Sequence, residues 1–373
     1  MSEDQLSITS GGEDLALDDS ATDDYDVGSQ GGIKPRILLM GPRRSGKTSI
    51  QRVVFYKMSP HETMFLEPTT SLDIKYVANN EFAQFQIWDF PGDHDISGES
   101  LMYGGEIVDT NVIFGAVSAL VLVVDAQDDP IEEALHRLVN TVRKAYSVNA
   151  NLEFEVFIHK VDGDLYLTDQ PKDDCLREVQ AFITRGISQY SLDIKMSYYL
   201  TSIYDHSIFD AISKVVQKLI PQLPTLENLL NCLISNCMME KSFLFDVVSR
   251  IYIATDSNPV HMATYELCCD MIDVAIDVSC IYGVREEEGK ETDRIAYDDH
   301  SASIIRLSNG TVLYLRQVGS YLALVCLMQA EHFNNKEGVI EYNINCFKQT
   351  LAQVFQRPLR QQMAQRAGAS PGA

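Results

Sequence analysis

The chain has 373 residues and a formal net charge of −23 at pH 7, from 53 acidic and 30 basic residues. At roughly 100–200 residues per domain, this length predicts two domains. The acidic excess argues against a nucleic-acid binder, which needs Lys and Arg to neutralise phosphates, and against adhesion to an anionic membrane surface.

The first 32 residues differ in composition from the rest of the chain. They contain nine acidic residues, no Lys or Arg, and few large apolar residues. Such a segment cannot bury enough apolar surface to offset the entropy lost on ordering. We therefore predict a disordered acidic tail over residues 1–32, with a docking tail for a basic partner as the functional alternative.

No direct membrane insertion is expected. The N-terminus has no basic region followed by an apolar run, so no signal peptide is predicted. The longest nearly apolar stretch runs from Val112 to Val124, and a bilayer span needs about 20 residues.

Residues 33–220 alternate strand and helix patterns. Apolar runs predict strands at 36–40, 85–88, 119–124, 154–158 and 198–200, and helical spacing predicts helices at 48–58, 131–146 and 208–219. The continuous run at 119–124 is typical of a strand buried on both faces. Strands that alternate with helices predict an α/β domain with a doubly wound, mostly parallel sheet.

The pattern changes after Pro221-Gln222-Leu223-Pro224, which marks a boundary. We expect a linker helix within 221–240 and a second domain over 241–356. Its strand-rich segments lie at 243–253 and 274–282, with a hairpin around Ser308-Asn309-Gly310, an apolar run at 322–329 and a helix at 341–355. This order predicts an α+β domain with an antiparallel sheet. Residues 357–373, rich in Gln, Arg and Gly, are predicted to form a flexible tail.

Residues 41–48 read GPRRSGKT and match GxxxxGK[ST] between a predicted strand and a predicted helix. Glycines let the backbone wrap phosphates so that its N–H groups point inward. Lys47 is expected to reach the β- and γ-phosphates, and the Thr48 hydroxyl to bind Mg²⁺. The predicted phosphate-binding residues are Gly41, Arg43, Arg44, Ser45, Gly46, Lys47, Thr48 and Ser49.

Two further segments predict contacts with Mg²⁺ and the γ-phosphate. Asp89-Phe90-Pro91-Gly92 follows a predicted strand, so Asp89 can hold the Mg²⁺ shell through water and the Gly92 amide can meet a γ-phosphate. A strand-capping turn would explain this motif alone equally well. Thr69 is the predicted switch threonine, which binds Mg²⁺ only while a γ-phosphate is present. Thr70 is the alternative switch residue. A hydroxyl that only stabilises a turn is the alternative without a function in metal binding.

The segment predicted to bind the nucleotide base is His159-Lys160-Val161-Asp162, which follows the predicted strand 154–158. The Asp162 carboxylate can accept hydrogen bonds from the ring N–H and exocyclic amine of guanine, a pair that adenine cannot supply. The Lys160 stem is expected to pack on the ring face. A backbone amide at Ser202 or Ile203 could touch the guanine carbonyl, although an ordinary helix cap explains these residues equally well.

Together these motifs resemble the Rag GTPases, specifically the C/D type. The resemblance is carried by GPRRSGKTSI, LEPTT, WDFPG, DAQDDP, FEVFIHKVDG, YYLTSIYDHSIFDA and QKLIPQLPTLENLLN, and by segments starting at Ser242 and Tyr265. It covers about residues 33–356. It implies a P-loop GTPase domain with GTP or GDP and Mg²⁺ as cofactors, followed by a roadblock-type dimerisation domain.

The resemblance also implies partners. Rag GTPases are heterodimers of a C/D-type and an A/B-type subunit, joined through their roadblock domains. The family is cytoplasmic and is recruited to the lysosomal surface by a lipidated scaffold complex. It relays amino-acid sufficiency to the target-of-rapamycin kinase complex, and a GTPase-activating protein is expected to assist hydrolysis. In this family the C/D-type subunit signals when GDP-bound.

Two positions depart from the generic GTPase pattern. His159 replaces the usual Asn, as in the C/D type itself. Asp93 stands where many GTPases, and usually C/D-type Rags, have a Gln that orients the attacking water. Asp93 adds like charge and offers no amide donor. With Asp93 and Thr69 as the predicted catalytic residues, we expect slow GTP hydrolysis.

Two alternatives to a regulatory GTPase are considered. The first is a pseudo-GTPase scaffold that binds nucleotide mainly for structure and acts through dimerisation, which Asp93 favours. The intact Lys47, Thr48, Asp89 and Asp162 favour the regulatory GTPase instead. The second, an ATP-dependent P-loop kinase, is disfavoured by Asp162 and by the absence of any acceptor-site signal.

Overall fold

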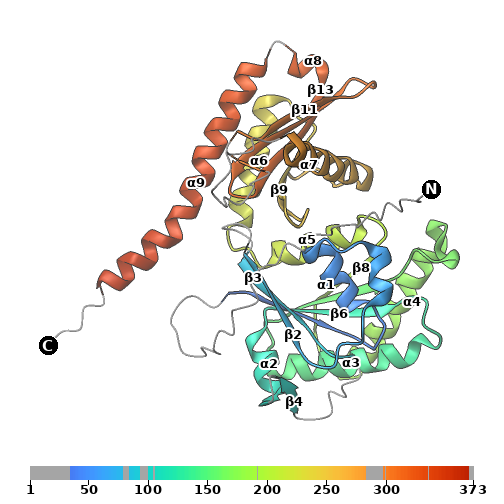
Figure 1. The fold of residues 1–373 in the computed structure, drawn as a ribbon. Coiled ribbons are helices and arrows are strands. Elements are labelled where there is room, and N and C mark those ends of the chain that lie inside the picture. Colours follow the sequence, from blue (N-terminus) through green and yellow to red (C-terminus); the bar gives the residue numbers. More distant parts are fainter. Residues whose placement is uncertain are drawn as a thin grey trace, which may run out of the picture. The chain divides into compact units, whose positions relative to one another are not determined.

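The computed structural model describes residues 34–78, 84–92, 100–103, 106–190, 192–282, 297–298, 300–334 and 336–368 (Figure 1). Side chains are described for all of these except residues 100–108, 110 and 355–368. The predicted acidic tail and the predicted catalytic residue Asp93 therefore lie outside the described residues.

The first half of the described chain forms a six-stranded sheet in the order β2-β3-β1-β6-β7-β8. Strand β2 pairs antiparallel with β3, and every other pair in this sheet is parallel. The predicted doubly wound, mostly parallel sheet is thus confirmed. Its strands are β1 (Arg36–Met40), β2 (Asp73–Ala78), β3 (Gln84–Asp89), β6 (Ala119–Asp125), β7 (Glu153–His159) and β8 (Met196–Thr201).

Helices cover both faces of this sheet because its central strands are apolar on both sides. Ile37 and Leu39 of β1 belong to the cluster that contains helices α1 (Lys47–Tyr56) and α5 (Ser207–Lys218). Leu38 and Met40 belong to the cluster that contains α3 (Ile131–Val148) and α4 (Asp169–Ser188). Each such fully buried aliphatic side chain contributes roughly 1.5–3 kcal/mol, so the two layers hold the carboxyl ends of the strands in fixed positions.

Short elements complete this half. They are the 3-10 helices η1 (Pro60–Phe65) and η2 (Asp164–Tyr166), the helix α2 (Thr110–Ala116), and a two-stranded sheet of β4 (Ser100–Tyr103) and β5 (Glu106–Asp109). Helix α2 begins at an Asp109 side chain that accepts a hydrogen bond from the Asn111 amide at 2.8 Å. This is a standard N-cap interaction.

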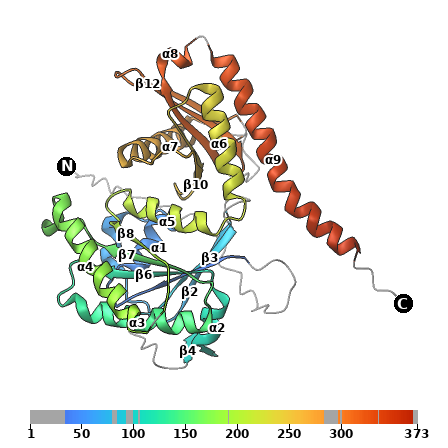
Figure 2. The same cartoon turned by 180° about the vertical axis from the view of Figure 1, so that it is seen from behind.

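The second half forms a five-stranded antiparallel sheet in the order β10-β9-β13-β12-β11. The predicted α+β arrangement with an antiparallel sheet is confirmed. Helices α6 and α9 contact each other beside this sheet (Figure 2). The elements are α6 (Leu223–Cys237), β9 (Lys241–Asp246), β10 (Tyr252–Thr255), α7 (Met262–Tyr282), β11 (Ala302–Arg306), β12 (Thr311–Gly319), β13 (Leu322–Gln329), α8 (Ala330–Phe333) and α9 (Glu337–Gly368).

Two expectations for this half are corrected. Residues 274–282 were expected to be strand-rich, yet they form the second half of helix α7. The β-branched residues there alternate in a way that also suits a strand, but Tyr265, Cys268 and Ile272 earlier in the helix are spaced for one buried face. Helix α9 continues to Gly368, through most of the segment for which the sequence predicts a flexible tail.

The two sheets are joined through buried polar contacts between α5 and β10. The Tyr252 hydroxyl donates to Asp210 Oδ1 at 2.7 Å, and the Tyr252 amide donates to Ser213 Oγ at 3.1 Å. Gln217 Nε2 donates to the Tyr252 carbonyl at 3.3 Å. Apolar residues of α5 and of the second sheet also belong to one continuous hydrophobic cluster. Among the described residues, no helix is both long and apolar enough to cross a bilayer.

Candidate functional site

The predicted phosphate loop lies between β1 and α1, as expected. Gly46 has φ 102°, a backbone conformation that residues with a Cβ rarely adopt, and a Cβ there would lie 2.6 Å from His159 Cδ2. Arg44 also has a positive φ, of 64°. Arg43 and Arg44 are exposed, and Ser49 lies in the first turn of α1. The loop is therefore a tightly wound turn that ends at a helix N-terminus, a geometry that suits an anion.

Two polar groups inside this loop are buried. Lys47 is 5% exposed, and its Nζ donates to the carbonyls of Gly41 at 2.9 Å and Pro42 at 2.8 Å. Ser45 is 1% exposed, and its hydroxyl has no hydrogen-bond partner among the described residues. A buried hydroxyl without a partner costs roughly 1–3 kcal/mol, so this loop is arranged to meet a polar ligand.

The predicted metal-binding residues meet at one point. Thr48 Oγ1 lies 2.7 Å from Thr69 Oγ1, and it donates to Asp89 Oδ2 at 2.5 Å. Thr69 Oγ1 also donates to Asp89 Oδ2, at 3.3 Å. Thr69 is partly buried, whereas Thr70 is exposed, so the structure brings Thr69 rather than Thr70 to this cluster.

Asp89 has the surroundings of a cation ligand. It is fully buried, and its Oδ1 has no hydrogen-bond partner among the described residues. Burial raises the pKa of this carboxyl, and the Thr48 hydrogen bond and the nearby Lys47 charge oppose that effect. The described residues contain no group of three His, Cys, Asp or Glu side chains that could hold a metal ion by themselves. A cation here would thus need oxygens from phosphate and water, which is how proteins commonly hold Mg²⁺.

Gly92 closes the phosphate loop from the side of β3. A Cβ at Gly92 would lie 2.5 Å from the Arg43 amide nitrogen, so only glycine permits this approach. The Phe90 amide donates to the Leu39 carbonyl at 3.1 Å and extends the pairing of β3 with β1. The segment that the sequence assigned to the γ-phosphate therefore lies directly against the phosphate loop.

Lys160 links three parts of the site. Its Nζ donates to the Arg44 carbonyl at 2.7 Å and to Asp125 Oδ2 at 2.6 Å. Its own carbonyl accepts a hydrogen bond from Gln127 Nε2 at 2.7 Å. Lys160 has φ 65°, a conformation that is uncommon for a residue with a side chain. The lysine stem is thus held across the loop that the sequence assigned to the base.

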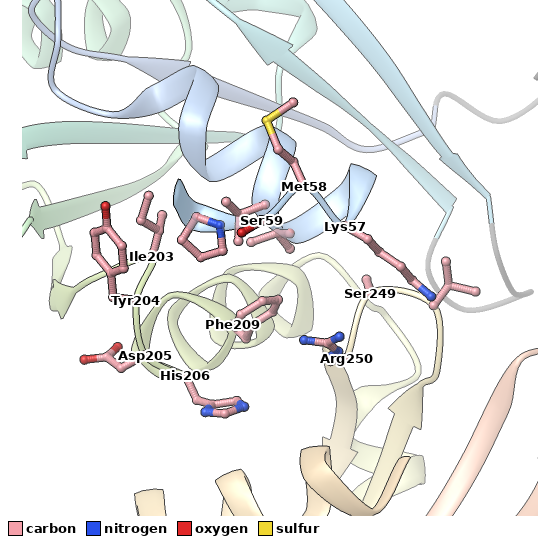
Figure 3. Close-up of a pocket in the computed structure, with 14 residues that line it drawn as sticks. Lys57, Met58, Ser59, Ile203, Tyr204, Asp205, His206, Phe209, Ser249 and Arg250 are labelled. Carbon is pink, nitrogen blue, oxygen red and sulfur yellow. The ribbon is translucent and has the colours of Figure 1, made fainter. Parts of the chain in front are cut away.

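Asp162 is exposed, and Ser202 fixes its orientation. Ser202 Oγ donates to Asp162 Oδ1 at 2.7 Å and accepts from the Tyr204 amide at 3.1 Å. The Ser202 amide donates to Ser207 Oγ at 2.9 Å, so it does not suit the predicted contact with a guanine carbonyl. Of the two predicted residues, Ile203 remains the amide candidate, and its side chain lines a separate pocket (Figure 3).

His159 differs from the role that its position in the motif suggested. It is 1% exposed, its Nδ1 lies 3.0 Å from Thr201 Oγ1, and its ring packs beneath Gly46. Burial, with a smaller effect from the Lys160 charge, lowers the pKa of His159 to about 4. The side chain is therefore a neutral support between the base loop and the phosphate loop.

Two residues that hold the site were given no role from the sequence. They are Asp125 and Gln127, which bind Lys160. Thr201 begins the segment 201–203 that the sequence assigned to the guanine carbonyl, but its side-chain contact with His159 was not predicted. The position of these residues is what could have revealed them, because they lie at or just after the carboxyl ends of β6 and β8. In open α/β sheets, ligands bind outside these ends. Knowing the strand order would have placed them in the site.

Comparison with known proteins identifies the family of the chain. The family model described as the Gtr1/RagA G protein conserved region matches residues 36–272. The chain belongs to the Gtr/Rag family of G proteins.

Within the Gtr/Rag family, the chain is a C/D-type subunit. It is 56% identical to the human protein named Ras-related GTP-binding protein C, over 87% of this chain and 77% of that protein. It is 53% identical to the mouse Ras-related GTP-binding protein D, over 91% and 74%. It is 48% identical to the GTP-binding protein gtr2 of Schizosaccharomyces pombe, over 87% and 99%. Ras-related GTP-binding protein A of Dictyostelium discoideum is only 24% identical, over 61% of this chain and 72% of that protein.

Proposed function

We propose that this Rag protein is a switch that binds GTP or GDP with Mg²⁺ and hydrolyses GTP slowly, with the help of an activating protein. The observation that carries the proposal is the meeting of Thr48, Thr69 and Asp89 beside the phosphate loop. Thr69 reaches this point from the loop between η1 and β2, which separates it in sequence from the other two. A nucleotide with a γ-phosphate would therefore order that loop through Thr69, and a nucleotide without it would release the loop.

The proposal assigns roles in nucleotide binding to the following groups of the site. Lys47 and the amides of the phosphate loop bind the phosphates. Thr48, Thr69 and Asp89 would hold Mg²⁺, which would neutralise phosphate charge. Asp162, oriented by Ser202, distinguishes guanine from adenine. Lys160 covers the base, and the Ile203 amide is the candidate donor to its carbonyl.

We propose further that the second half is the roadblock-type domain and pairs with an A/B-type Rag subunit. Helix α7 presents exposed apolar residues that recur at helical spacing, and it contacts the edge strand β11, where Ile304 is 48% exposed. Apolar faces of this kind mark protein interfaces. The exposed residues of α7 are Val274, Val278, Ile281 and Tyr282.

The cellular part of the proposal rests on the resemblance to the Rag family alone. We propose recruitment from the cytoplasm to the lysosomal surface by a scaffold complex, and relay of amino-acid sufficiency to the target-of-rapamycin kinase complex.

Nucleotide content tests the proposal. The protein is purified alone and with an A/B-type Rag subunit, denatured, and its nucleotide separated by ion-exchange chromatography. We expect close to one GTP or GDP per chain and a stable complex. An adenine nucleotide would contradict the role of Asp162, and a chain that binds no nucleotide even with Mg²⁺ present would contradict the whole site assignment.

A scaffold that binds nucleotide only for stability is the second candidate, and Asp93 is the observation that favours it. Exchange kinetics separate the two functions. A switch releases labelled GDP faster when an exchange factor or a chelator of Mg²⁺ is added, whereas a scaffold holds the nucleotide for as long as the chain stays folded.

A further inference from the structure

The turn around η2 exposes two leucines on either side of a buried tyrosine. Leu165 is 74% exposed and Leu167 is 78% exposed, whereas Tyr166 between them is 9% exposed. The turn belongs to the connection from β7 to α4, in the first half of the chain. Two large apolar side chains are thus left in water within three consecutive residues, which marks this turn as a candidate for contact with another molecule.

Tyr166 fixes this turn against the neighbouring loop 126–130. Its hydroxyl donates to the Ala126 carbonyl at 2.7 Å, and its ring belongs to the hydrophobic cluster that contains α3 and α4. Burial raises the pKa of the Tyr166 hydroxyl, so it remains a donor. A Cβ at Gly163 would lie 2.6 Å from Gln127 Nε2, so the two loops pack closely. Turning the two leucines inward would break these contacts, and their exposure is therefore built into the fold.

The two packed loops carry negative charge. The segments 126–136 and 161–171 contain seven Asp or Glu residues and no Lys or Arg. All seven carboxylates are exposed. They are Asp128, Asp129, Glu132, Glu133, Asp162, Asp164 and Asp169.

The basic residues around these segments do not balance that charge. Of the three that border them in sequence, Arg137 pairs with Glu133 at 2.8 Å and Lys160 pairs with Asp125 at 2.6 Å. Lys172 is partly buried and has no ion pair within the described ranges. Asp162 is set aside, because the proposed function assigns it to guanine. The five remaining carboxylates still outnumber the cations when Lys172 and the two arginines of the phosphate loop are all counted.

We propose that the two leucines and the five carboxylates beside them form a docking surface for a basic amphipathic helix of a partner protein. Such a helix has one apolar stripe bordered by Lys or Arg, so it can cover the leucines and reach the carboxylates at the same time. The apolar contacts supply affinity, and the charges select a basic partner over an acidic one. The surface lies apart from α7 in the sequence, and its occupation does not depend on the guanine assignment.

Binding is tested by fluorescence anisotropy on the full chain in complex with its A/B-type partner. The probe is a fluorescein-labelled helical peptide whose leucines form one stripe bordered by lysines. The double variant Leu165→Ala, Leu167→Ala should raise the Kd about tenfold, because two large apolar side chains lose their contact. The control is Val339→Ala with Tyr342→Ala, at exposed positions of α9, which should change the Kd by less than about twofold. Equal affinity in the leucine variant and the wild type would overturn the proposal.

The role of the charges is tested with a matched pair of neutralising variants. Asp164→Asn with Asp169→Asn should raise the Kd about threefold at low salt, and by less at high salt, where exposed charges are screened. The control is Glu153→Gln with Asp193→Asn, at exposed carboxylates near the amino ends of β7 and β8, on the opposite edge of the sheet. Both double variants change the net charge equally. Equal weakening in both would show unspecific attraction to an acidic chain, and the proposed surface would be wrong.

The competing occupant is the chain's own basic segment 356–368, which contains three arginines and no acidic residue. It is tested in the full chain by the triple variant Arg357→Gln, Arg360→Gln, Arg366→Gln. Equal affinity for the probe in this variant and the wild type would support an external partner. Several-fold tighter binding in the variant would show that the chain's own segment competes for the surface, and the partner proposal would be wrong.

Discussion

At the scale of single residues, His159 lies between the base loop and the phosphate loop as a neutral imidazole. Its pKa falls from 6.5 to about 4, first because it is buried and next because of Lys160, while Asp162, Asp125 and the hydrogen bond to Thr201 act in the opposite direction. In the unfolded chain the imidazole gains a proton near pH 6.5, and in the folded chain it does so only near pH 4. The contribution of the neutral His159 to folding stability is therefore fully present above about pH 6.5. It is lost as the pH falls toward 4.

We expect the free energy of unfolding to fall by about 3 kcal/mol between pH 6.5 and pH 4 because of this histidine. The measurement is urea unfolding of the wild type and of His159→Asn at a series of pH values. Asn has no proton to gain, so the slope of stability against pH should be smaller in the variant over that window. Identical slopes would show that His159 does not resist protonation.

Asp162 is expected to select the base. The substitution Asp162→Asn replaces an acceptor of two hydrogen bonds by an amide that can donate to the extra carbonyl of xanthine. Two lost charge-assisted bonds correspond to about a hundredfold loss in GTP affinity, with xanthosine triphosphate now preferred. Equilibrium binding of both nucleotides measures the change. Unchanged GTP binding would remove the base assignment.

Thr69 and Thr70 form a matched pair, because they are adjacent and only Thr69 contacts Thr48 and Asp89. Thr69→Ala should weaken GTP binding about tenfold, as expected for one lost interaction of about 1.4 kcal/mol, and should leave GDP binding within about twofold. Thr70→Ala should change neither affinity. Titrations in the presence of Mg²⁺ distinguish the two, and a larger effect at Thr70 would reverse the assignment.

The site motifs could be predicted from sequence where chemistry restricts the residue type. Gly46 and Gly92 are required because a side chain at either position would collide with His159 or Arg43, and such constraints are visible as motifs. Asp125 could not be found in this way. A carboxylate after an apolar run is common, and only the parallel pairing of β6 with β7 brings it to Lys160.

At the scale of secondary-structure elements, the buried strands were predictable and the partly exposed elements were not. Strand β6 is apolar throughout because both of its faces are covered. Strand β2 has mixed composition and lies at the sheet edge, so it was not predicted. Helix α7 carries β-branched residues on its outer surface, where packing within this chain does not determine the residue type. The strand prediction was wrong because these residues also suit a strand.

The outer surface of α7 should be the main determinant of pairing with an A/B-type subunit. Val278 is 50% exposed, so Val278→Asp should leave the fold of the single chain intact. A charge placed in an apolar interface should weaken the complex by at least about tenfold. The control is Val339→Asp, at a valine of α9 that is 61% exposed. Size-exclusion chromatography of co-expressed pairs measures the result, and equal loss of the complex in both variants would place the interface elsewhere.

At the scale of the whole molecule, the contact between α5 and β10 decides whether the two sheets unfold together. Asp210 is 7% exposed and accepts hydrogen bonds from Tyr252 and Lys214. Burial raises the pKa of Tyr252 far above the ordinary value for tyrosine, and the neighbouring Asp210 adds to this effect, so the phenol remains a donor. Because hydrophobic residues on both sides of this contact form one cluster, we expect a single cooperative unfolding transition for the part of the chain that the structure describes.

Replacing Tyr252 by Phe tests this coupling. The substitution keeps the ring and removes the hydrogen bond to a buried carboxylate, so it should destabilise the protein by about 1–3 kcal/mol. Tyr297→Phe is the matched control, since that buried hydroxyl donates to the Leu322 carbonyl at 2.8 Å within the second half alone. In calorimetry, Tyr252→Phe should broaden or split the transition, whereas Tyr297→Phe should only lower its midpoint. The same response in both variants would mean that the two halves are coupled by apolar packing, with no measurable contribution from the Tyr252 hydroxyl.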